Sequence, residues 1–207
     1  MLRPFIACLC FAVALAALPA CRSADLPEVQ QVEQPFTKLE RRRNPNTGSR
    51  WKEWEVLVYP DGRKVKHGKE FTWHPNDQLQ QERFFDHGEV TGRLRTWYDD
   101  GTLRSEYTFA GGDRATPMSF WHPDGSLSAE GVAVNGRRVG PWRYYHPGGA
   151  LAESGPYVDG RREGEWAEYH PDGSLAARGH YARGKKVGEW GRWPEGYDFD
   201  SQAPFPD

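Results

Sequence analysis

Hydrophobic and polar positions repeat with a fixed period along most of the chain. Five consecutive 24-residue units begin at Gly68, Gly92, Thr116, Gly140 and Gly164. The sixth residue of each is aromatic, namely Trp73, Trp97, Trp121, Tyr145 and Tyr169. The twelfth is always Leu, namely Leu79, Leu103, Leu127, Leu151 and Leu175, and the twenty-first is always Gly. Three columns held without insertion indicate an array of structural repeats.

Each unit is expected to form one β-hairpin and a link to the next unit. The segment His170-Pro171-Asp172-Gly173 is typical of a hairpin tip, because Pro presets φ at the first corner and Gly takes the left-handed position. This loop places the residue before the His opposite the Leu, so Tyr169 pairs with Leu175. Repeated five times, the pattern predicts a structural ladder of aromatic and Leu residues, buried on one face of the sheet.

The opposite face is expected to carry a row of tryptophans, at the third place of the later units: Trp142, Trp166 and Trp190. At about 9.6 Å apart, two strand spacings, they form a candidate binding face that could stack on polysaccharide rings or on apolar side chains. Alternatively, they cover the second face of a one-layer sheet where glycines leave backbone to protect. Residues expected across from this column are Glu82, Glu106, Glu130, Ser154 and Arg178.

The columns resemble the MORN repeat, in the variant found in bacterial proteins labelled YwqK-type antitoxins. The residues that carry the resemblance are Gly164-Glu165-Trp166, Tyr169-His170-Pro171-Asp172-Gly173, Leu175, Tyr181 and Gly184-Lys185-Lys186-Val187-Gly188. It covers about Trp54 to Trp193 and implies an all-β fold, an elongated single-layer antiparallel sheet of tandem 24-residue β-hairpin repeats. The unit at Thr116 departs most. Pro156 predicts a local break, because it cannot donate to a strand ladder.

The N-terminus predicts export. An apolar stretch at residues 5–18 follows Arg3 and is shorter than the roughly 20 residues of a spanning helix. Residues 1–20 are therefore interpreted as a signal peptide. Leu18-Pro19-Ala20-Cys21 resembles a bacterial lipobox, which implies lipidation of Cys21, and Arg22 after the cysteine implies the outer membrane. The alternative is a plain signal peptide with an unmodified Cys21.

Three further segments complete the predicted organisation. Residues 21–50 are polar and contain Arg41-Arg42-Arg43, as expected for a lipidated N-terminus and flexible tether. The arginines could contact anionic headgroups or remain solvated. The repeat domain is predicted over residues 51–196, followed by a Pro-rich tail at residues 197–207.

Charge and hydropathy exclude two classes of protein. The 207 residues contain 27 Lys and Arg against 29 Asp and Glu, a net charge of −2 that provides no broad positive field for nucleic acid. A mean hydropathy of −0.83 excludes a multi-span membrane protein.

No constellation of residues predicts catalysis. One unit position holds His74, His122, His146 and His170, but a row spaced by about 9.6 Å cannot converge on a zinc ion, so these are expected to be turn-edge residues. The sequence therefore predicts no enzyme, no metal and no cofactor. We expect a non-catalytic binding or scaffolding module of an envelope lipoprotein with an unknown protein partner. The alternatives are an antitoxin-like neutraliser of a toxin, and a binder of envelope polysaccharide or phospholipid.

Overall fold

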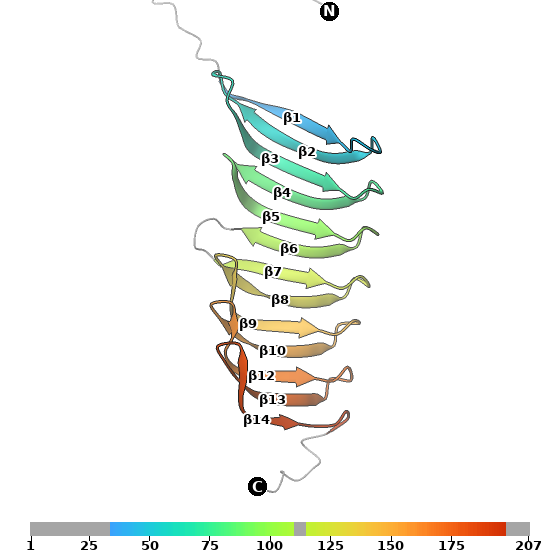
Figure 1. The fold of residues 1–207 in the computed structure, drawn as a ribbon, viewed down its shortest axis with the longest axis vertical. Coiled ribbons are helices and arrows are strands. Elements are labelled where there is room, and N and C mark those ends of the chain that lie inside the picture. The colour runs from blue at the N-terminus through green and yellow to red at the C-terminus, as the bar shows by residue number, and fades with distance from the viewer. Residues whose placement is uncertain (1–33, 110–114, 198–207) are drawn as a thin grey trace, which may run out of the picture. The chain divides into compact units, whose positions relative to one another are not determined.

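A computed structural model describes residues 34–109 and 115–197. Within these ranges the chain forms a single open antiparallel sheet of 14 strands and contains no helix, so no helix there could cross a membrane (Figure 1). The strands are β1 (Phe36–Arg43), β2 (Arg50–Val58), β3 (Lys64–Trp73), β4 (Leu79–Asp86), β5 (Glu89–Trp97), β6 (Leu103–Phe109), β7 (Thr116–Trp121), β8 (Leu127–Val134), β9 (Arg137–Tyr145), β10 (Leu151–Val158), β11 (Arg161–Arg162), β12 (Gly164–Tyr169), β13 (Leu175–Ala182) and β14 (Lys185–Arg192).

The strands lie in the sheet in the order of the chain (Figure 1). The two-residue β11 lies off this order and pairs with β10. Every hairpin therefore joins neighbours in sequence, which confirms the predicted all-β, single-layer antiparallel sheet. The signal peptide, Cys21, residues 22–33 of the predicted tether and the tail from residue 198 lie outside the described residues.

The hairpin tips have the predicted geometry. At the last tip the N–H of His170 donates to the Ser174 carbonyl at 2.8 Å, and Gly173 has a φ of 88°. Tyr169 then pairs with Leu175, as predicted. The other four aromatic and Leu pairs form in the same register, namely Trp73 with Leu79, Trp97 with Leu103, Trp121 with Leu127, and Tyr145 with Leu151.

A β-bulge after each Leu changes what lies across from the tryptophans. In β13, Leu175 pairs with Tyr169 but Ala177 pairs with Glu168, so Ala176 is an extra residue. The bulge moves the partner of Trp166 from the expected Arg178 to Gly179. The prediction that the tryptophan column lies across from Glu82, Glu106, Glu130, Ser154 and Arg178 is therefore wrong.

The core lies on the face of the tryptophan column. We call this the aromatic face and the other the ladder face; the aromatic face includes Phe120, Trp142, Tyr144, Tyr157, Trp166, Tyr181 and Trp190. Trp142 and Trp166 are 0% and 1% exposed, because the guanidinium groups of Arg138 and Arg162 lie over their rings at 4.7 and 4.1 Å. The ladder residues are only partly buried, less than expected, so the ladder face contributes less to the core than the aromatic face does.

The sheet begins earlier than expected. β1 lies inside the segment predicted as tether and pairs with β2 from Phe36 opposite Val58 to Arg43 opposite Arg50. It is an edge strand, mostly exposed on both faces, so its sequence lacks the alternation that identifies a half-buried strand. The Arg run is part of this strand, and Arg42 lies over the Trp54 ring at 5.6 Å.

The predicted break at Pro156 is present. Pro156 lies opposite Pro141 of β9, and on its other side β10 pairs with β12 only through Glu153 with Glu168 and Ser154 with Ala167. The link between β10 and β12 contains the two-residue strand β11, which pairs with the end of β10. The ladder also shifts register at the equivalent place of other units, for example between Glu130 and Val132, so the missing N–H donor accounts only for the further pair that Pro156 lacks.

Candidate functional site

Two of the three tryptophans proposed as a binding row serve as cover for the backbone. A Cβ added at Gly131 or Gly155 would lie 2.3 Å from the ring of Trp142 or Trp166, so each indole packs flat on a glycine. The Trp142 Nε1 donates to the Val132 carbonyl at 3.0 Å, and the Trp166 Nε1 to the Pro156 carbonyl at 3.1 Å. With their faces and N–H groups occupied, these two indoles cannot bind a ligand, and this part of the prediction is wrong.

Trp190 differs from the other two members of the column. It packs on Gly179 in the same way but stays partly exposed, with the Lys186 ammonium 3.8 Å from its ring centre. Its Nε1 is buried without a hydrogen-bond partner among the described residues. It therefore remains the one accessible member of the predicted binding face.

The polar groups between the covered tryptophans satisfy one another. The hydroxyls of Tyr144 and Tyr157 lie 2.9 Å apart, and Arg138 Nη1 donates to the Tyr144 oxygen at 2.9 Å. Burial, together with the hydrogen bond to Tyr157, raises the pKa of Tyr144 well above its usual value. A tyrosine held neutral in this way supports packing and offers no base for catalysis.

The first unit fills the same positions with charges. Glu70 occupies the place of Trp142, and Arg83, which pairs with it, occupies the place of Gly155. Glu70 is 1% exposed and contacts Lys66 at 2.5 Å, Lys52 at 3.1 Å, and Arg83. Burial alone would raise the pKa of the Glu70 carboxyl, but hydrogen bonds from the three cations outweigh it and lower that pKa.

An open cavity of about 210 Å³ lies beside this carboxylate, lined by Arg42, Lys52, Trp54 and Lys66, which we call the cationic pocket. Lys52, Lys66 and Arg83 contact the Glu70 carboxylate, and Arg42 lines the cavity beside them, so these five groups together carry a net positive charge. It can accept an anionic group and pack its apolar part on Trp54. Sequence reasoning missed this site. The signal for it is the presence of Glu70 at the repeat position of Trp142, and of Arg83 at the repeat position of Gly155.

The histidines of the tips join neighbouring units. The Nε2 of each donates to a carbonyl 23 residues further along: His74 to Trp97 at 3.0 Å, His122 to Tyr145 at 2.8 Å, His146 to Tyr169 at 2.9 Å and His170 to Trp193 at 3.0 Å. Where the column holds Tyr98, its hydroxyl donates to the Trp121 carbonyl at 2.9 Å. These side chains are structural, and each links its own hairpin tip to the next unit.

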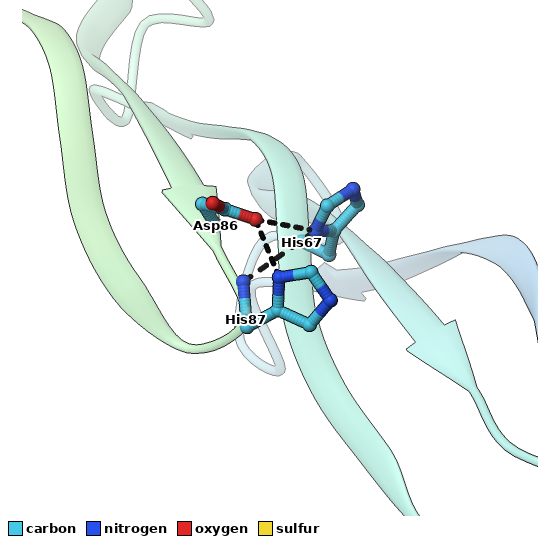
Figure 2. Close-up of side chains that lie close together, drawn as sticks. All are labelled: His67, Asp86 and His87. Carbon is cyan, nitrogen blue, oxygen red and sulfur yellow. Dashed lines mark hydrogen bonds and ion pairs between the residues drawn. The ribbon is translucent and has the colours of Figure 1, made fainter.

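A different histidine cluster is the group that could hold a metal. His67, Asp86 and His87 come from β3, the end of β4 and the turn that follows, and their ligand atoms lie within 4.8 Å of one another (Figure 2). The sequence argument considered only the tip histidines, so this cluster was missed.

The architecture is that of a β-hairpin repeat protein with one continuous sheet. The family model of the MORN repeat variant matches four segments, at residues 66–87, 90–110, 138–159 and 162–183. The unit at Thr116, which departs most from the pattern, is not among them. No curated protein matches the chain.

Proposed function

We propose that the chain is a non-catalytic binding and scaffolding repeat module that acts through protein–protein interaction. The observation that supports this is the cationic pocket. In this part of the aromatic face, accessible charged side chains replace the buried rings of the later units. Guanidinium and ammonium groups beside an indole suit an acidic side chain of a partner, since charge-assisted hydrogen bonds are the strong ones. Arg42 is exposed and supplies such a donor at the edge of the pocket.

A role without catalysis is consistent with how the polar groups are used. His122 and His146 are bonded to carbonyls of the next unit, and the buried Tyr144 hydroxyl is bonded to Tyr157 and Arg138. Groups committed to the fold in this way are not available as general acids or bases.

We place the module at the cell envelope, as an exported lipoprotein of the outer membrane anchored through Cys21. This part of the proposal rests on the apolar stretch at residues 5–18 and on Leu18-Pro19-Ala20-Cys21. Metabolic labelling with a fatty acid should mark the wild type and not Cys21→Ser. A labelled Cys21→Ser protein would contradict the anchor.

The pocket is tested by crosslinking and pull-down of the full, membrane-anchored chain from its own cells. Arg42→Glu reverses the most exposed charge of the pocket, and Arg192→Glu makes the same change at an exposed position of β14. A partner protein should be captured by wild type and Arg192→Glu and be lost with Arg42→Glu. Capture that Arg42→Glu leaves unchanged would show that the pocket is not the contact.

Two other classes of function are separated by the same variants. The resemblance to YwqK-type proteins suggests an antitoxin-like neutraliser, in which case the captured partner is an exported toxin. A cationic pocket also suits the phosphate of a phospholipid or an acidic polysaccharide. Binding to anionic vesicles or cell-wall material that Arg42→Glu abolishes, with no protein captured, would favour that class instead.

A further inference from the structure

The cluster of His67, Asp86 and His87 combines two ligand types that bind zinc in proteins, imidazole and carboxylate. The Asp86 Oδ1 lies 3.3 Å from the Nδ1 of His67 and 2.6 Å from the Nδ1 of His87 (Figure 2). Tetrahedral zinc with ligands at roughly 2.0 Å requires neighbouring ligand atoms about 3.3 Å apart. The first distance already fits, and the second needs a small opening.

The hydrogen bonds of the cluster leave a conflict that a cation would remove. The His67 Nδ1 lies 3.4 Å from the backbone N–H of His87, which requires a lone pair on that nitrogen. The same nitrogen faces the Asp86 carboxylate, which requires a proton on it. A metal ion between the three atoms accepts the lone pairs of both imidazoles and of the carboxylate, so no proton is needed on the His67 Nδ1, and the N–H of the exposed His87 is left to solvent.

The other units show that the fold does not need these three residues. The places of His67 and Asp86 are held by Val139 and Val158 in the unit 72 residues further on. The place of His87 is held by Asn135 in the unit 48 residues further on and by Asp159 in the unit 72 residues further on. The φ angles of Asn135 and Asp159 are 49° and 48°, against 47° for His87. The turn therefore forms equally well without a histidine.

The geometry points to a zinc-type metal site in which His67 and His87 Nδ1 and an Asp86 carboxylate oxygen bind one divalent transition-metal ion, with water completing the coordination. The side chains are 35%, 61% and 61% exposed, so solvent reaches the open positions. The ion ties β3 to the turn between β4 and β5, next to Lys66 of the cationic pocket.

The test is calorimetric titration of the metal-free, untagged full chain with Zn²⁺. We expect one ion per chain with micromolar affinity, weakened about tenfold or more in His67→Val and in His87→Asn. His180→Ala, an exposed histidine outside the cluster, should bind as the wild type does. Zinc should also raise the melting temperature of the wild type, because it binds only the folded state.

The triple variant His67→Val/Asp86→Val/His87→Asn gives the first unit residues that later units already carry. It should melt as the metal-free wild type does, so that a loss of zinc binding cannot be attributed to unfolding. Stoichiometric zinc binding retained by the triple variant, loss of binding in His180→Ala, or no binding by the wild type below millimolar zinc would each overturn the proposal.

Discussion

The first repeat unit and the last two units occupy equivalent positions of one sheet with opposite chemistry. In the later units a tryptophan covers a glycine, as Trp166 covers Gly155, and an arginine closes the ring from above. In the first unit the corresponding positions hold Glu70, Arg83 and Lys66, joined as ion pairs. The hairpin backbone is the same in both regions.

The comparison shows that the backbone of this repeated hairpin does not specify what covers the aromatic face. A large ring needs a partner without a side chain, whereas a buried carboxylate needs cations, because an unpaired buried charge is strongly destabilising. The tryptophan units are closed by this arrangement, and the charged unit remains open beside Trp54. Binding is therefore expected where the pattern of the repeat changes.

The largest effect is expected from removing a covering ring. Trp166→Ala should lower the free energy of unfolding by about 4 kcal/mol, within the range for truncating a buried Trp. Trp190→Ala is the control at the same repeat position, and its loss should be about half as large because Trp190 is partly exposed. Both losses are measured by urea denaturation monitored by circular dichroism. Equal losses would contradict the difference in burial between Trp166 and Trp190.

Removing the buried carboxylate is the corresponding change in the first unit. Glu70→Gln leaves Lys52, Lys66 and Arg83 facing one another and should cost about 3 kcal/mol at neutral pH. The Glu70 pKa is lowered in the folded state, so its contribution is present above the unfolded pKa of about 4.3 and is lost as the pH falls through the folded pKa. The difference between wild type and Glu70→Gln should therefore shrink below about pH 4.

The two chemistries should also be exchangeable. Adding Trp and Gly together, in Glu70→Trp/Arg83→Gly, reproduces the later units and should be more stable than either single variant. A double variant no better than the worse single variant would show that the two positions are not coupled.

An intermediate effect is expected at the glycines beneath the rings. Gly155→Ala places a Cβ 2.3 Å from a ring carbon of Trp166 and should cost about 2 kcal/mol through overpacking. Ser154→Ala, one residue earlier and therefore on the ladder face, is the control and should change stability by about 0.5 kcal/mol or less. A Gly155→Ala protein as stable as the control would mean that the ring is free to move.

The smallest effect is expected on the ladder face. Leu127→Ala and Leu151→Ala remove half-buried methyl groups and should each cost about 1 kcal/mol, below the 2 to 5 kcal/mol typical of cores. The midpoint of chemical denaturation measures this loss. A cost above that of Trp166→Ala would place the main core on the ladder face after all.

The sequence predicted the features that depend on local turn chemistry. The tip at His170-Pro171-Asp172-Gly173, the pairing of Tyr169 with Leu175 and the break at Pro156 all follow from residues close to one another in the chain. They were correct because φ preferences and a missing donor act within a few residues.

The features that were missed depend on register and on edges. Ala176 has no sequence mark of a bulge, yet a shift of one residue decides whether Trp166 meets Arg178 or Gly179. β1 has no apolar alternation, because this edge strand is mostly exposed on both faces and buries neither of them. The cationic pocket could have been found at Glu70, since a carboxylate in a column of tryptophans requires buried cations around it.

The hydrogen bonds from each tip to the next have a consequence for synthesis of the chain. His122, His146 and His170 each donate to a carbonyl 23 residues later, so a tip finds its acceptor only after almost one more unit has been made. During synthesis the units are therefore expected to fold one after another, starting from the N-terminal end. The last acceptor is the carbonyl of Trp193. Truncation before that residue would therefore leave the His170 side chain of the final tip without its hydrogen-bond acceptor.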